Sequence, residues 1–359
     1  MKDRIYLFSP PQVFGGSEVY QIRLAELMHL QQRFTVISPP SPELQRGIAN
    51  AGGGFVELRG NGGIAIRLAF LGWLWRNRKM LRQHAAALVL NGRGAAYFSP
   101  MVILITGISP VIICHTELST KGTDIKERLF GWALHFARCA VAVSETVARQ
   151  HIHRWPALSV SAIPNWIDGA LYKDSPVSQG ASAAPADIAV VGRLAENKGI
   201  LDILAACSDV AGPDVHFYGV GPLQKTVEEM AASVPNLKTH GHVEALWQQL
   251  ASHAILLSAS YSESFSYSVA EGIHAGLLCV VSDIPAHREL LGPDYPDTLY
   301  FSPGDQDGLR AALAAAHNYL AREDGGVADI IGLAKARMRH RNGPDQARKD
   351  YCAVLLEAS

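Results

Sequence analysis

The sequence has almost no charge imbalance and few cysteines, and both features exclude classes of protein. Its 32 Lys and Arg residues and 33 Asp and Glu residues give a formal net charge of −1. A near-neutral chain argues against binding nucleic acid by neutralising phosphates. None of its five cysteines forms a CxxC pair, and four of them lie in apolar runs, as small buried hydrophobes in a reducing compartment do.

Long apolar segments are also lacking. No run reaches the roughly 18 uninterrupted apolar residues of a transmembrane helix. The opening "MKDRIYLFSPP" turns polar too early for a signal peptide and is typical of a first strand. We therefore expect a cytoplasmic globular protein, and its 359 residues predict two domains.

Short apolar runs alternate with helix-length segments along nearly the whole chain. Such alternation predicts an α/β fold with parallel sheets covered on both faces, here two doubly wound Rossmann-like domains facing across a cleft. The predicted strands are Ile5–Phe8, Phe34–Ile37, Phe55–Leu58, Ala87–Leu90, Val111–Cys114, Cys139–Val143, Ile188–Val191, Val215–Tyr218, Leu237–Thr239, Ile255–Leu257 and Leu278–Val281. Helices are expected over Glu18–Leu30, Ile64–Gln83 and Ile125–Ala137.

The segment "KDSPVSQGASAAPA" separates the two halves and has the composition of a linker. We predict a first domain over residues 1–170, a linker over 171–187 and a second domain over 188–338. Residues 339–359 are expected to form a C-terminal helix that packs back toward the first domain. Ligands of open parallel sheets bind beyond the carboxyl ends of the strands, so functional residues are expected there.

The second half begins with "IAVVGRLAENKGI", in which a buried strand ends at Gly192. Arg193 and Lys198 follow, just before a helix that is expected to start near Gly199. Two cations beside a helix N-terminus could bind a diphosphate. They could equally be surface charges of a solvated loop. The next strand ends in "FYGVGPL", which lacks the third glycine of a dinucleotide fingerprint and indicates a tight turn.

In the first half, "SPPQVFGGSEVYQ" places Gly15 and Gly16 between the first strand and the first helix, with Ser17 as the expected N-cap. "VIICHTE" ends another strand at His115. A lone histidine is more often structural than catalytic, but this one lies at a strand's carboxyl end. Both interpretations stay open.

Residues 64–82, within "IAIRLAFLGWLWRNRKMLRQH", carry Trp73, Trp75 and several cations. They predict either an interfacial helix on anionic lipid or a helix packed on the sheet with a solvated basic end. The nearby "KGTDIKERLF" is also basic. "DQD" at 305–307 has the form of a metal–nucleotide site, but an N-cap and a first-turn acid explain it, so no metal is assigned.

The segment "SYSESFSYSVAEG" contains two glutamates, Glu263 and Glu271, after a buried strand. Ser268 and Glu271 have the S-x-x-E spacing of a capping box at a helix start. That local explanation gives Glu263 no role.

These motifs together resemble the retaining glycosyltransferases of family 4, which have the GT-B fold. "SYSESFSYSVAEGIHAGLLCVVSDIPAHREL" is similar to that family's E-x7-E segment, and "GRLAENKG", the Gly15–Gly16 loop, "CHT", "AVSE" and "IPNWID" extend the resemblance over most of the chain. It implies a nucleotide-sugar-binding second domain and an acceptor-side first domain.

The resemblance also implies roles for single residues. Glu271 would accept both ribose hydroxyls, in competition with the capping box, and Glu263 would lie under the donor sugar. Arg193 and Lys198 would hold the diphosphate leaving group near Gly192, and His115 would reach the sugar. The nucleotide-sugar contacts would include the backbone amides of Ser264, Phe265, Ser266 and Tyr267.

The implied activity is metal-independent, retaining transfer of a hexose-type sugar from a UDP-, GDP- or ADP-sugar, with no cofactor. The acceptor would be a glycan or a lipid-linked glycan of lipopolysaccharide or exopolysaccharide synthesis, which would place the enzyme on the inner face of the cytoplasmic membrane. A GT-B sugar-nucleotide epimerase and a non-catalytic sugar-nucleotide-binding module are the alternatives. The chain departs from the family pattern at two positions, with Ser266 for Gly and Leu278 for Pro. A side chain at 266 could narrow the sugar pocket and so bears on donor identity, whereas Leu278 lies within a predicted strand and should matter less.

Overall fold

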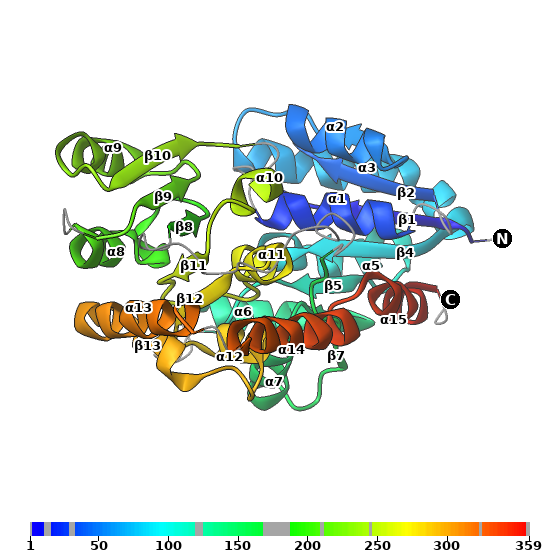
Figure 1. The fold of residues 1–359 in the computed structure, drawn as a ribbon. Coiled ribbons are helices and arrows are strands. Elements are labelled where there is room, and N and C mark those ends of the chain that lie inside the picture. Colours follow the sequence, from blue (N-terminus) through cyan, green and yellow to red (C-terminus); the bar gives the residue numbers. More distant parts are fainter. Residues whose placement is uncertain are drawn as a thin grey trace. The chain divides into compact units, whose positions relative to one another are not determined.

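The computed structural model describes residues 2–10, 16–28, 33–118, 125–167, 187–208, 212–243, 246–322 and 325–356. The chain divides into two compact units (Figure 1). The first unit comprises Met1–Asn165 and Pro344–Ser359, and the second comprises Trp166–Gly343. The predicted boundaries at 170 and 338 each lie five residues from these positions, at 165 and 343. All of the predicted linker except Asp187 lies outside the described residues.

The first unit contains a seven-stranded sheet of order β3-β2-β1-β4-β5-β6-β7, with parallel pairing throughout. Its strands are β1 (Arg4–Phe8), β2 (Arg33–Ser38), β3 (Gly54–Glu57), β4 (Ala85–Asn91), β5 (Val111–Cys114), β6 (Cys139–Ala142) and β7 (Val160–Ala162). Its helices are α1 (Gly16–Met28), α2 (Pro42–Asn50), α3 (Gly63–His84), α4 (Gly92–Ala96), α5 (Ser99–Thr106), α6 (Ile125–Leu134), α7 (Glu145–Arg154) and α15 (Pro344–Leu356).

The second unit contains a six-stranded parallel sheet of order β10-β9-β8-β11-β12-β13. Its strands are β8 (Ile188–Val191), β9 (Val215–Tyr218), β10 (Leu237–Gly241), β11 (Ile255–Ser258), β12 (Leu278–Ser282) and β13 (Tyr300–Phe301). Its helices are α8 (Ile200–Cys207), α9 (Gln224–Ser233), α10 (Leu246–Leu250), α11 (Tyr267–Ala275), α12 (Pro285–Leu291), α13 (Gln306–Leu320) and α14 (Gly326–Arg341), with 3-10 turns η2 (Glu196–Lys198) and η3 (Asp297–Leu299).

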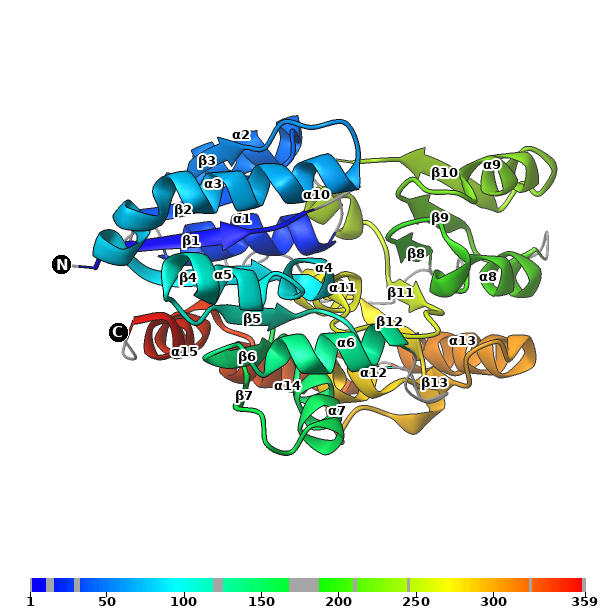
Figure 2. The ribbon, with the colours of Figure 1, turned by 180° about the vertical axis from the view of Figure 1, so that it is seen from behind.

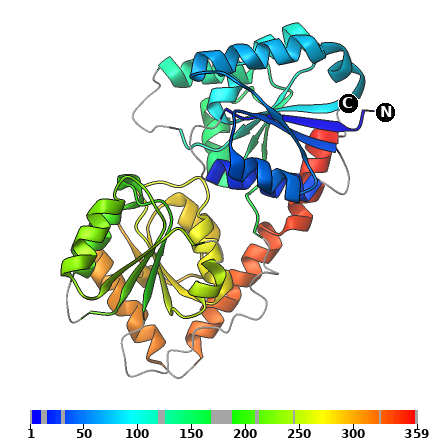
Figure 3. The same cartoon turned by 90° about the horizontal axis from the view of Figure 1, so that it is seen from above.

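The predicted strands are confirmed. They could be predicted because the central strands are apolar on both faces. Every residue of β4 and of β12 is buried, as expected where helices cover both sides of a parallel sheet. Figure 3 shows this layering within each unit. The two strands that were not predicted, β7 and β13, are short edge strands of three and two residues.

The C-terminal segment forms two helices rather than the single one predicted over 339–359. α14 ends at Arg341 and α15 begins at Pro344, because proline can start a helix but cannot continue one. α15 packs on the first unit, where the hydroxyl oxygens of Tyr351 and Tyr20 lie 2.6 Å apart.

Candidate functional site

The second sheet reverses its strand order between β8 and β11. From β8 the chain continues to β9 on one side, whereas β11 pairs with β8 on the other. In open parallel sheets the crevice at such a switch point, beyond the carboxyl ends of the strands, is where ligands bind. Arg193 and Lys198 follow β8, and Glu263 follows β11, so the fold brings the two predicted motifs to the same edge of the sheet, at its switch point.

A glycine allows these two loops to touch. Gly199 has a φ of +65°, and a Cβ added to it would lie 2.1 Å from the Ala259 carbonyl oxygen. The amide of Tyr261 donates to the Asn197 carbonyl at 3.0 Å across the same junction. The glycine of the predicted phosphate motif therefore serves to bring Lys198 beside the loop of Glu263.

Glu263 forms an ion pair with Lys198, whose Nζ donates to Oε1 of the carboxylate. The hydroxyl of Ser260 donates to the same oxygen at 2.8 Å. The Glu263 and Lys198 side chains are 13% and 28% exposed, so the pair is shielded but reachable from solvent. A fixed carboxylate beside an ammonium group can stabilise charge of either sign in a bound ligand.

A buried serine and a buried histidine hold this loop in place through two consecutive hydrogen bonds. The Ser282 hydroxyl donates to the Ser260 carbonyl at 2.6 Å, and His287 donates from Nδ1 to the Ser282 carbonyl at 2.8 Å. Burial lowers the pKa of His287 to about 4, so its imidazole is neutral. Sequence reasoning missed these residues, although Ser282 ends an apolar run and so lies at the expected edge.

Helix α11 corrects the capping-box interpretation. The N-cap residue is Ser266, in an extended conformation, and the helix begins at Tyr267. Ser268 therefore lies inside the first turn, and Glu271 lies in the second turn rather than the first. The capping box is wrong, and its competition with a ligand-binding role for Glu271 disappears.

The segment before α11 is largely packed. Ser266 is buried, and its side chain makes no cap hydrogen bond within the described structure. Phe265 packs on the core of the second unit and meets the ring of Tyr267 edge-on, with 4.9 Å between centroids. Ser264 is half-buried. The helix start of α11 therefore has no side-chain cap. Its first-turn amides can donate to an anion.

The glycines of "FYGVGPL" pack on the predicted phosphate loop. A Cβ on Gly219 would lie 1.9 Å from the Gly192 carbonyl oxygen, and one on Gly221 would lie 2.4 Å from the Leu194 carbonyl oxygen. These glycines therefore allow a close backbone approach between the ends of β8 and β9. Arg193, on the same loop, is exposed.

The first sheet has its own switch point, between β1 and β4, and a polar network lies there. His115, just after β5, lies with Nε2 2.6 Å from Oδ1 of Asn91, the last residue of β4. The amide nitrogen of Asn91 donates to the hydroxyls of Ser9 (3.2 Å) and Ser17 (3.1 Å). Because those two bonds orient the amide, its oxygen faces His115, and the histidine proton is on Nε2.

This network bears on two residues of the predicted motifs. Burial lowers the pKa of His115 to about 4, so its imidazole is neutral. Ser17 is not the N-cap, because α1 already includes the exposed Gly16, and Ser17 accepts from Asn91 instead. Gly15 lies outside the described residues. Asn91 was missed, although it too ends an apolar run.

The interpretation of "DQD" as a helix start is confirmed. Asp305 is the N-cap of α13 and accepts from the Gly308 amide at 2.9 Å. Asp307 lies in the first turn and pairs with Arg310 at 2.7 Å.

Both halves of the chain match known protein families. Residues 14–170 match the family model described as Glycosyltransferase Family 4, and residues 185–318 match the one described as Glycosyl transferases group 1. A phosphatidyl-myo-inositol mannosyltransferase from Mycolicibacterium smegmatis is 26% identical, over 86% of this chain and 82% of that protein.

Solved structures share the fold at low identity. HepE of Anabaena, in complex with UDP-glucose, superposes with a TM-score of 0.80 at 16% identity, over 98% of this chain and 99% of that one. A sucrose-phosphate synthase from Thermosynechococcus elongatus superposes with a TM-score of 0.78 at 14% identity, over 99% of this chain and 100% of that one.

Two parallel α/β units with these structural relatives define the GT-B fold. Both halves of the chain match glycosyltransferase models, and the chain belongs to the family 4 glycosyltransferases.

Proposed function

We propose that the protein is a retaining hexosyltransferase that uses a nucleotide-diphosphate sugar. The observation that carries this proposal is the Glu263–Lys198 pair at the switch point of the second sheet. A carboxylate there can stabilise positive charge at the anomeric carbon, while the adjacent cations stabilise the departing diphosphate. Glu271, which lies one helical turn after the first residue of α11, would accept the ribose hydroxyls.

The donor can be found with a thermal-shift panel of UDP-, GDP- and ADP-sugars and the free nucleotides. A ligand at 100 times its dissociation constant stabilises the native state by about 2.7 kcal/mol. We expect one nucleotide series to raise the midpoint, and Glu271→Gln to abolish the rise for that series. If no nucleotide or nucleotide sugar raises the midpoint, the proposed donor class is wrong.

The contact between Asn91 and His115 predicts how a substitution at Asn91 changes the pKa of His115. In Asn91→Asp, a carboxylate replaces the amide and favours the imidazolium form of His115. The pKa of His115 should therefore rise from about 4 toward its ordinary value of 6.5. Histidine ring NMR during a pH titration measures this. Asn77→Asp on α3 is the control and should leave the value unchanged; a value still near 4 in Asn91→Asp would contradict the contact.

We expect transfer without added divalent metal. Asp305 and Asp307 are engaged in starting α13, and the cations Arg193 and Lys198 can neutralise the leaving group in place of a metal. Enzyme treated with EDTA should keep its turnover. Loss of activity that Mn²⁺ or Mg²⁺ restores would show this prediction to be wrong.

The acceptor is proposed to be lipid-linked, and the first unit exposes an apolar face that suits a bilayer. None of the helices in the described ranges is long and apolar enough to cross a membrane. Helices α3, α5 and α6 lie side by side (Figure 2). The face consists of exposed Ile64, Leu68, Trp75, Met101, Leu104, Ile125, Leu129 and Trp132. One relative is named as a phosphatidyl-myo-inositol mannosyltransferase, and this name supports a lipid acceptor.

The tryptophans and cations of α3 differ in how far they are available to a bilayer. Trp73 is half-buried against Tyr6, with 5.8 Å between ring centroids, because residues two apart on a helix point to opposite sides. Arg82 donates to the Thr106 carbonyl at 2.8 Å and so holds the end of α5. Trp75, with Arg78 stacked over it at 4.2 Å, stays at the surface.

We expect the protein to co-sediment with anionic vesicles, and increasing salt should weaken the binding as the Debye length falls from about 10 Å at 0.1 M to about 3 Å at 1 M. Leu104→Ser combined with Trp75→Ala should abolish sedimentation. Leu333→Ser, at a similarly exposed leucine of the second unit (59% against 75%), is the matched control. If all variants and the wild type sediment equally, the face is not a membrane contact.

A further inference from the structure

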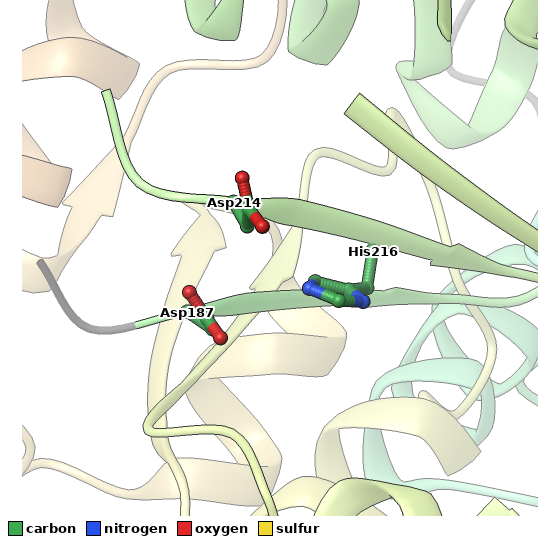
Figure 4. A group of neighbouring side chains, drawn as sticks. All are labelled: Asp187, Asp214 and His216. Atoms are coloured by element: carbon green, nitrogen blue, oxygen red, sulfur yellow. The ribbon is translucent and has the colours of Figure 1, made fainter. Parts of the chain in front are cut away.

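A second cluster of chemistry-bearing side chains lies at the opposite end of β8 and β9. Asp187 directly precedes β8 and Asp214 directly precedes β9. Ile188 pairs with Val215, so the two aspartates are neighbours across the sheet. His216 is the second residue of β9. One ligand atom from each of these three half-buried residues lies within 4.8 Å of the other two (Figure 4).

The histidine presents an unsatisfied nitrogen to the carboxylates. His216 Nε2 is buried, and no described residue hydrogen-bonds to it. Figure 4 shows the ring directed toward Asp187 and Asp214. A buried polar atom without a partner costs about 1–3 kcal/mol. Because this unpartnered nitrogen faces two carboxylates, it indicates a ligand bound between the three side chains.

Surrounding rings fix the orientation of the imidazole. His216 Nδ1 lies 2.9 Å from Nε2 of His240, and the two rings stack with 5.1 Å between centroids. Tyr218 stacks on His240 at 4.5 Å, and His253 meets His216 edge-on at 4.7 Å. The ring is therefore held in place with Nε2 toward the aspartates.

The charge of the cluster also favours a cation. Among the described residues, Asp214 forms an ion pair with Lys238 at 3.9 Å, and no ion pair of Asp187 is seen. A single ammonium group against two carboxylates leaves one net negative charge at a half-buried position, and this charge favours the binding of a cation.

We propose that Asp187, Asp214 and His216 bind a divalent transition-metal ion of the zinc class. Imidazole nitrogen with carboxylate oxygen is a ligand set for Zn²⁺, whereas Mg²⁺ and Ca²⁺ take oxygen ligands. In a tetrahedral site, ligand atoms about 2.0–2.2 Å from Zn²⁺ are about 3.4 Å apart. The aspartate side chains would rotate toward the histidine to reach this spacing, and water would supply the fourth ligand. His216 then donates from Nδ1 to His240, as metal-bound histidines usually do to a supporting acceptor.

The site would join the beginnings of β8 and β9, whereas the proposed catalytic residues lie beyond the other ends of the sheet's strands. Its metal would stabilise the second unit and take no part in sugar transfer. The proposal therefore does not depend on the proposed function.

Calorimetric titration of the full-length chain with Zn²⁺, after removal of metal by a chelator, tests the proposal. We expect one Zn²⁺ per chain at this site and a higher unfolding midpoint with the metal. Asp187→Asn and Asp214→Asn should each abolish both effects, while Asp307→Asn, an exposed aspartate elsewhere, should retain them. His240→Ala should weaken binding about 10- to 100-fold, and His242→Ala, at an exposed neighbour, should not.

A crystal of the zinc-treated protein should give an anomalous peak among Asp187, Asp214 and His216. If wild type binds no Zn²⁺, or if Asp187→Asn and Asp214→Asn bind it as well as wild type does, the proposal is wrong. Circular dichroism melts of the metal-free variants exclude misfolding as the cause of a loss.

Discussion

Glu263→Gln is expected to reduce turnover by about 100- to 1000-fold, the range seen when one charge-stabilising group is removed from an active site. Glutamine keeps the shape of the side chain and can still accept from Ser260, but it cannot stabilise positive charge at the anomeric carbon. The loss should appear in kcat, with a small effect on donor affinity, because the interaction strengthens in the transition state. Steady-state kinetics with the donor selected by the thermal-shift panel measures it.

The control for this variant lies in the adjacent motif. Glu196→Gln makes the same chemical change at an exposed residue of η2, and its turnover should match that of wild type. If Glu263→Gln has the kcat of the control while only KM rises, Glu263 binds the sugar without acting on the reaction.

Arg193→Ala and Lys198→Ala should each cost roughly 2.7–4 kcal/mol of transition-state stabilisation, by analogy with lost oxyanion donors. Charge on the diphosphate grows as the glycosidic bond breaks, so turnover should fall more than nucleotide-sugar affinity. Lys198 is paired with Glu263 before the donor binds, so it must exchange this partner, at least in part, for the phosphate. Kinetics and donor calorimetry on each variant separate the two effects.

The two cations should differ in their coupling to Glu263. Lys198→Ala combined with Glu263→Gln should be non-additive because the groups are in contact, whereas Arg193→Ala combined with Glu263→Gln should be closer to additive. If donor affinity falls while turnover is unchanged, Arg193 and Lys198 only bind the donor.

Much of the fold could be predicted because its central strands are continuous buried runs, which local sequence determines. The loops after β8 and β11 could be predicted too, since their glycines and charges follow those runs directly. The contact between Lys198 and Glu263 could not, because it depends on β8 and β11 being neighbours in the sheet although β9 and β10 lie between them in sequence.

The same reason explains the missed residues. Asn91 reaches His115 only because β4 and β5 are adjacent, and Ser282 supports Ser260 only because β11 and β12 are. The capping box failed for a local reason: Ser266 and Ser268 are both competent caps, and the spacing to Glu271 alone does not decide between them.

The stereochemistry of transfer is the most direct test of the proposed reaction. The anomeric proton of the transferred sugar can be followed by ¹H NMR from the first turnovers, with wild type and with Glu263→Gln. The account predicts that wild type releases the nucleoside diphosphate and yields a product with the anomeric configuration of the donor, while the variant yields almost none. A product of opposite configuration, or equal product from Glu263→Gln, would contradict it.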